Sequence, residues 1–137
     1  MNKSGYSKTP LAKKLGIKTG FNLMVLNPPF TYLELFDELP DDLNFSNDTA
    51  SKKDFIHYFS DNLSQLEEKI ELLKNSIVQD GMIWISWPKK ASKIPTDLNG
   101  NIVREIGLKN GLVDIKVCAI NEIWSGLKFV IPVKNRI

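Results

Sequence analysis

The sequence is poor in the features that mark extracellular and membrane proteins. Cys118 is the only cysteine among 137 residues, so no internal disulfide can form, and its apolar neighbours indicate a small buried side chain. The longest apolar runs, such as 23–26 and 82–85, fall far short of the roughly 20 residues that span a bilayer. The polar segment 1–6 lacks the apolar core of a secretory signal. We therefore expect a cytoplasmic protein that does not contact a membrane.

Charge is nearly balanced overall but unevenly distributed along the chain. The formal net charge is +2. Residues 1–33 contain five lysines and no acid, residues 34–80 contain twelve acids and four lysines, and residues 81–137 contain nine bases and four acids. If the two ends lie together, the molecule has a basic face and an acidic face. The modest net charge favours the alternative of a mixed solvated surface, so nucleic acid is not the expected partner.

Strand-like and helix-like apolar patterns alternate along the chain. The predicted strands are 21–27, 54–60, 82–87, 112–120 and 127–133, with at most a short edge strand at 43–45. The predicted helices are 9–16, 32–39, 62–79 and 97–110, and turns are predicted at Pro28-Pro29, Asp80-Gly81 and 121–126. Such alternation gives a parallel sheet with right-handed crossovers, whereas the short connection 121–126 makes the last two strands antiparallel. We predict one α/β domain over residues 1–137, a three-layer Rossmann-like mostly parallel sheet with a C-terminal antiparallel hairpin.

Two resemblances follow from these elements. The order of elements, and the segment 80–86 that enters the third strand, resemble the class I S-adenosylmethionine-dependent methyltransferase fold with elements trimmed from its first half. A second resemblance is to a family of small bacterial proteins catalogued as domain of unknown function 3052. It is carried by the segments Gly5–Gly16, Trp87–Ser92, Val117–Ile120 and Trp124–Lys128. The first resemblance implies a methyltransferase-like fold, and the second implies no assigned activity.

The first strand ends at a turn that lacks the expected glycines. Folds of this kind place glycines at this turn so that the backbone can approach a cofactor, but no glycine occurs between Gly20 and Gly81. Asn27 is followed by Pro28 and Pro29, which have no N–H to offer. We therefore predict no cofactor.

The same turn carries a short motif. Asn27, Pro28, Pro29 and Phe30 resemble the Asn/Asp-Pro-Pro-aromatic motif of amino-group methyltransferases. That resemblance implies that the asparagine and the backbone hold a target nitrogen while the ring stacks on the substrate. The alternative is a strand that ends in a Pro-Pro turn, with Phe30 covering the core.

A candidate ligand-binding site lies across the predicted sheet. Its residues end or follow the third strand or belong to the predicted hairpin turn: Trp87, Lys89, Lys90, Ser92, Trp124 and Ser125. The two segments are expected at the same edge of the sheet, where ammonium groups suit a phosphate or carboxylate and indole rings suit a planar group. The alternative is that the tryptophans pack at the margin of the core and the lysines are solvated.

Catalytic and metal-binding patterns are not found. His57 is the only histidine and lies in an apolar strand, so we expect a hydrogen-bonded core or edge side chain. No zinc pattern, P-loop, nucleophile elbow or acid–base pair can be assembled, and no catalytic or metal-ligating residue is predicted.

The sequence therefore favours a methyltransferase-like domain that is not an enzyme and that binds a small anionic ligand or a protein partner. One alternative is an active S-adenosylmethionine-dependent methyltransferase with an atypical cofactor site, which makes S-adenosylmethionine its cofactor. A second alternative is a nucleic-acid-binding accessory protein that uses the basic ends of the chain.

Overall fold

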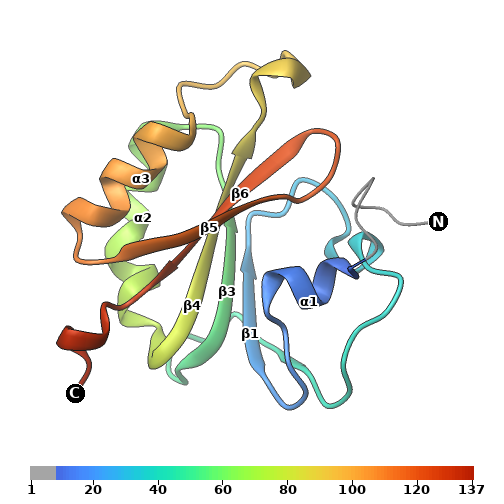
Figure 1. Ribbon diagram of the computed structural model, residues 1–137, viewed down its shortest axis with the longest axis vertical. Helices are drawn as coiled ribbons and strands as arrows, with labels where there is room; N and C mark the ends of the chain where they lie inside the picture. Colours follow the sequence, from blue (N-terminus) through green and yellow to red (C-terminus); the bar gives the residue numbers. More distant parts are fainter. Residues whose placement is uncertain (1–8) are drawn as a thin grey trace.

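The computed structural model describes residues 9–137, which form a six-stranded mixed sheet (Figure 1). Its strands are β1 (Asn22–Leu26), β2 (Asn44–Phe45), β3 (Lys53–Phe59), β4 (Ile77–Pro88), β5 (Val113–Ala119) and β6 (Trp124–Val130). They lie in the order β2-β1-β3-β4-β6-β5, and β6 runs antiparallel to both of its neighbours. The predicted fold class, a mostly parallel α/β sheet with a C-terminal antiparallel hairpin, is confirmed. The expectations for residues 1–8 lie outside the described residues.

Helices cover both faces of the sheet. They are α1 (Leu11–Leu15), α2 (Leu63–Asn75) and α3 (Gly100–Lys109), with 3-10 turns η1 (Tyr32–Leu35), η2 (Lys90–Ser92) and η3 (Val133–Asn135). In Figure 1, α2 and α3 lie on one side of the sheet and α1 on the other. The side chains of Asn62 and Asn99 accept hydrogen bonds from backbone N–H groups in the first turns of α2 and α3, both at 2.9 Å. These caps satisfy donors that lack a partner within the helix, so each helix begins just after its asparagine.

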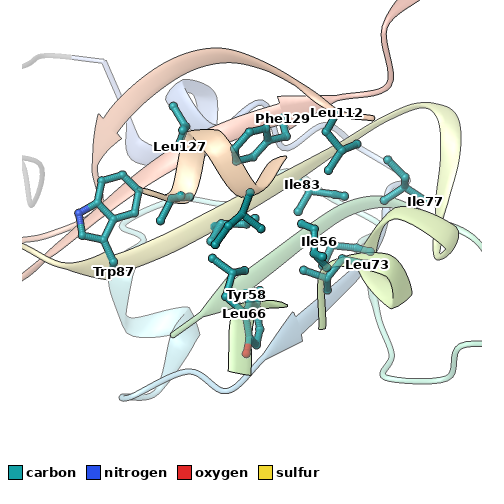
Figure 2. Close-up of a cluster of buried hydrophobic side chains, with 14 of the residues drawn as sticks. Ile56, Tyr58, Leu66, Leu73, Ile77, Ile83, Trp87, Leu112, Leu127 and Phe129 are labelled. Atoms are coloured by element: carbon teal, nitrogen blue, oxygen red, sulfur yellow. The ribbon is translucent and has the colours of Figure 1, made fainter. Parts of the chain in front are cut away.

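An aliphatic core fills the space between the sheet and the helices α2 and α3 (Figure 2). Figure 2 shows Trp87 at one end of this core and Leu73 and Ile77 at the other. Helix α3 lies very close to β6: a Cβ placed on Gly107 would lie 2.1 Å from the ring of Phe129. Only glycine permits this separation of helix and strand.

The opposite core is aromatic and is covered by α1 and η1. Leu11 and Leu15 of α1 pack on this face with Phe55, Phe59 and other buried side chains. The indole Nε1 of Trp84 donates a 2.8 Å hydrogen bond to the carbonyl of Leu15, across 69 positions of sequence. Gly16 ends α1 in the left-handed conformation at φ +88°. The short helix predicted at 9–16 is therefore present, shortened to residues 11–15.

The helix predicted over 32–39 is wrong beyond its first turn. Glu34 and Phe36 donate to carbonyls three residues earlier, which closes a 3-10 turn, and Phe36 is already extended. Burial of Tyr32, Leu35 and Phe36 against the sheet overrides the helical spacing of the apolar residues. No long helix therefore follows β1.

The predicted boundary between the second helix and the third strand is also wrong. Helix α2 ends at Asn75, and Ile77, which falls within the predicted helix 62–79, is a buried residue of β4. The segment Asp80-Gly81 is not a turn, because it lies inside β4 where the register against β3 shifts. A Cβ on Gly81 would lie 3.1 Å from the carbonyl oxygens of Lys53 and Val78, so glycine permits this irregularity.

Candidate functional site

The carboxyl ends of β1, β3 and β4 meet at the top of Figure 1. Backbone and side-chain bonds hold these ends together. The amide Nδ2 of Asn27 donates to the carbonyl of Phe59 at 3.0 Å, and the N–H of Ser60 donates to the carbonyl of Ser86 at 3.0 Å. We call residues 27–30, 60–62 and 89–93 the carboxyl edge. Ligands of open α/β sheets bind at such an edge, so it is the candidate functional site.

The turn after β1 is shaped by the backbone of Asn27. This residue has φ +57°, a left-handed conformation that asparagine adopts more readily than most residues. Asn27, Pro28 and Pro29 are exposed, whereas Phe30 is half-buried and its ring packs edge-on against Phe59 at 5.4 Å between centroids. The asparagine and the prolines therefore face solvent while Phe30 covers the margin of the aromatic core.

The loop after β4 is joined to the turn between β5 and β6, at the same edge of the sheet, as the sequence predicts. The N–H of Lys89 donates to the carbonyl of Ile123 at 2.7 Å, and its Nζ donates to the carbonyl of Asn121 at 2.9 Å. The hydroxyl of Ser92 donates to the carbonyl of Lys89 at 2.6 Å. Lys89 and Ser92 thus hold the loop in place, and Lys90 is exposed beside them.

The structure does not bring the two candidate tryptophans together. Trp124 and Ser125 lie in β6 and not in the predicted turn, and they pair with Pro88 and Trp87 of β4. Successive residues of a strand point to opposite faces of the sheet. Trp87 is therefore buried in the aliphatic core, and Trp124 in the aromatic core at 5.4 Å from Phe59. A single pocket lined by both indoles is not formed.

A chain of buried polar side chains crosses the aromatic core, and only its middle member, His57, was predicted from the sequence. The hydroxyl of Tyr32 and Nδ1 of His57 are hydrogen-bonded at 2.7 Å, and Nε2 of His57 and the hydroxyl of Ser86 at 2.7 Å. The His57 side chain is fully buried and stacks on Phe59. Burial lowers the pKa of His57 to about 3 and raises the pKa of Tyr32. The hydrogen-bonded side chains of Tyr32, His57 and Ser86 are therefore uncharged at physiological pH, and they hold η1 on the sheet.

The carboxyl edge offers polar groups of several kinds but no metal-binding cluster. Asp61 and Asn62 are exposed after β3, as are Asn27 after β1 and Lys90 after β4. Among residues 9–137, no group of three histidine, cysteine, aspartate or glutamate side chains is placed to hold a metal ion. Within the same residues, no helix is both long and apolar enough to cross a membrane.

Solved structures similar to this chain are S-adenosylmethionine-dependent methyltransferases and related proteins. A methyltransferase from Aquifex aeolicus superposes with a TM-score of 0.57 at 14% identity, over 88% of each chain. The ribosomal protein L11 methylase from Lactobacillus delbrueckii subsp. bulgaricus has a TM-score of 0.56 at 11% identity, over 87% of this chain and 73% of that one. The fibrillarin pre-rRNA processing protein of Methanococcus jannaschii has a TM-score of 0.57 at 12% identity, over 83% and 67%.

Other similar structures are longer than this chain. The chain spans 46% of magnesium protoporphyrin IX methyltransferase from Synechocystis PCC 6803, with 65% of this chain covered, 16% identity and a TM-score of 0.49. No family model and no curated protein matches the sequence. At these identities the similar structures establish a methyltransferase-like fold, and membership of the domain of unknown function 3052 family stays a prediction.

The similar structures correct one expectation. The absence of glycines from the turn after β1 predicted a domain that is not an enzyme. The matched structures include S-adenosylmethionine-dependent methyltransferases and a ribosomal protein methylase. These matches contradict the expectation that the chain is not an enzyme.

The turn after β1 does not fit the glycine loop that cofactor-binding folds of this kind use. Pro28 and Pro29 have no N–H, and the amide of Asn27 is bound to the carbonyl of Phe59. A cofactor at this edge must therefore be held by groups other than a row of backbone N–H donors after β1. Exposed groups of the carboxyl edge include the amide oxygen of Asn27, the carboxylate of Asp61 and the ammonium of Lys90.

Proposed function

We propose that this protein is an S-adenosylmethionine-dependent methyltransferase with an atypical cofactor site at the carboxyl edge. The observation that carries the proposal is the sheet itself, in which the antiparallel strand β6 lies between β4 and β5. The similar structures support it because S-adenosylmethionine-dependent methyltransferases are among them at TM-scores above 0.5. The cofactor site is called atypical because the turn after β1 contains no glycine.

Asn27 is the residue through which this edge would hold a substrate. Its Nδ2 is bound to the carbonyl of Phe59, which fixes the orientation of the side chain. The amide oxygen is then the group that accepts a hydrogen bond from an amino group of a substrate. The half-buried ring of Phe30, fixed edge-on against Phe59, is the neighbouring apolar surface. The proposed substrate is therefore a molecule with a planar or apolar body and an N–H group.

Titration calorimetry with S-adenosylmethionine tests the proposal. We expect saturable binding to the wild-type protein, and chemical-shift changes in backbone amides that cluster at 27–31, 60–62 and 89–93. Absence of binding at millimolar S-adenosylmethionine would overturn the proposed function. Shift changes confined to the opposite edge of the sheet would overturn the location of the site.

A matched pair of variants tests the role of Asn27. Asn27→Gly removes the side-chain amide and keeps the left-handed backbone. The control, Asp42→Gly, removes a carboxylate and keeps a left-handed backbone at φ +59° in the loop before β2. We expect N27G to lower the rate of methyl transfer to amine substrates at least tenfold, while D42G keeps the wild-type rate. Equal rates for N27G and the wild-type protein contradict the assigned role.

The loop after β4, residues 89–93, supports a narrower expectation about anionic ligands. Lys90 is exposed, whereas the ammonium of Lys89 is bound to the carbonyl of Asn121. A carboxylate or phosphate of a bound ligand would therefore pair with Lys90. Lys90→Gln should weaken binding of an anionic ligand more than the matched substitution Lys109→Gln on α3, and calorimetry compares the two. An equal effect of the two substitutions contradicts the pairing with Lys90.

A further inference from the structure

Lysines from the two basic ends of the sequence converge on one surface. Lys116 of β5 and Lys128 of β6 lie directly opposite each other in the antiparallel register. The Nζ of Lys128 lies 3.7 Å from the position that a Cβ would occupy on Gly16, which places it against the end of α1. Lys18 is exposed two residues after Gly16. We call Lys18, Lys116 and Lys128 the lysine surface.

The lysine surface is not neutralised by acids. Between residues 9 and 137, the ion pair that the structure shows is Arg104 with Asp114, at 3.1 Å and on the α3 side of the sheet. The pKa of Lys128 is lowered first by burial and then by repulsion from Lys116 and Lys18. Like charges placed directly opposite on neighbouring strands are destabilising. Repulsion among these lysines therefore lowers the stability of the free protein, and a bound anion would relieve it.

The positive charge continues from the lysine surface to the carboxyl edge. Cys118 lies opposite Gly126 on the same face as Lys116, and the pKa of its thiol, which burial raises, is lowered in part by the charges of Lys14, Lys116 and Lys89. The backbone of Lys89 is bound to that of Ile123, five residues before Lys128 on the β6 side of the hairpin. At about 3.3 Å per residue, five residues span about 16 Å. Lysines thus follow the β5–β6 ribbon from the carboxyl edge toward α1.

We propose that the lysine surface binds the phosphate backbone of a nucleic acid and guides the strand toward the carboxyl edge. The proposal of a guided strand rests on the proposed methyltransferase function, whereas the binding itself does not. Ammonium groups pair with phosphate as point charges. A row of three or more lysines matches the regularly spaced negative charges of a phosphate chain better than it matches a single small anion.

Fluorescence anisotropy with labelled oligonucleotides tests the proposal. The arms are single-stranded RNA, single-stranded DNA and duplex DNA, titrated between about 50 and 200 mM salt. The test variant is Lys116→Gln with Lys128→Gln, and the control is Lys109→Gln with Lys134→Gln, which removes the same charge from exposed positions elsewhere. We expect at least a tenfold loss of affinity in the test variant and less than a twofold loss in the control. The salt slope for single strands should fall by about 1.4 in the test variant.

Three results would overturn the inference. The first is absence of oligonucleotide binding by the wild-type protein at low salt. The second is an equal loss of affinity in the test and control variants, which would indicate diffuse charge and not a defined surface. The third is tighter binding to poly-glutamate than to every oligonucleotide, which would indicate an acidic protein partner. Calorimetry with S-adenosylmethionine on the same variants separates failure of nucleic-acid binding from failure of the proposed function. The lysine surface is not part of the cofactor site, so cofactor binding should be unchanged in these variants.

Discussion

The hydroxyl of Tyr32 lies 2.7 Å from Nδ1 of His57, and this buried contact joins the segment after β1 to the middle of the sheet. Their rings meet edge to face at 5.3 Å between centroids. Tyr32 follows the turn 27–31 directly, so the contact also fixes the chain that carries Asn27 at the carboxyl edge. The stability of this contact therefore bears on the candidate site.

Tyr32→Phe should lower the free energy of unfolding by about 1–3 kcal/mol, because it leaves a buried ring nitrogen of His57 without a partner. Urea denaturation measures the change. Tyr58→Phe is the control: it removes a phenol hydroxyl beside Ser60, and Ser60 keeps its hydrogen bonds with Asn62 when the phenol is lost. A loss in Y58F as large as that in Y32F would contradict the special role of the buried chain.

Acid should destabilise the protein through His57. Its pKa is about 3 in the folded protein, against the ordinary 6.5 expected in the unfolded chain. Between these values the unfolded chain binds more protons, so stability is complete above about pH 6.5 and falls as the pH decreases toward 3. The slope from this group reaches about 1.4 kcal/mol per pH unit.

The His57 contribution is measured by comparison with His57→Gln, since carboxylates titrate in both proteins. Free energies of unfolding at a series of pH values from about 7 to 4 should decline less steeply in H57Q than in the wild-type protein. Parallel pH profiles for the two proteins would show that the pKa of His57 is the same in the folded and unfolded states, contrary to its burial.

Two glycines of α3 should respond oppositely to alanine. Gly107→Ala should be destabilising by about 1–3 kcal/mol, because the new Cβ collides with the ring of Phe129. Gly100→Ala meets Trp87 at 3.4 Å, an ordinary contact, and should be neutral or stabilising by up to about 1 kcal/mol through helix propensity. Thermal and urea unfolding of both variants gives the comparison, and a stabilising G107A would show that α3 is free to move away from β6.

Removing one charge from the lysine surface should stabilise the free protein. Lys116→Gln relieves the repulsion with Lys128 across the strand pair, and we expect a gain of about 0.2–1 kcal/mol in the free energy of unfolding. The gain should shrink as salt screens the charges. Lys109→Gln on α3 is the control and should show no such salt-dependent gain. A loss of stability in K116Q would mean that Lys116 makes a favourable contact in the free protein.

The sequence was sufficient to predict the central strands and the α/β class. Residues 23–26 of β1 are all apolar and β3 has four apolar side chains among its seven residues, a pattern that favours strands buried on both faces of a sheet. Gly16 ends the predicted helix 9–16 and Gly111 follows the predicted helix 97–110, and they adopt positive φ values of +88° and +84°. These features depend on local chemistry, which a sequence carries directly.

The features that the sequence did not predict depend on contacts between distant segments. Ile77 suits the inner face of a helix and a buried strand equally well, and only pairing with Lys53 makes it a strand residue. The face on which Trp124 lies was fixed by a turn that ends at Ile123, and not at Gly126 as predicted. Because side chains alternate along a strand, this boundary decided which core each tryptophan enters, and with it the shape of the candidate site.

The hydrogen bond between Trp84 and Leu15 has a consequence for the order in which the chain folds. Its partners are 69 residues apart, and α1 has only five residues, too few to persist as an isolated helix. During synthesis, α1 emerges long before the strand on which it docks. The aromatic side of the sheet can therefore be closed only after β4 has been made, and the first helix in the sequence is among the last elements to find its place.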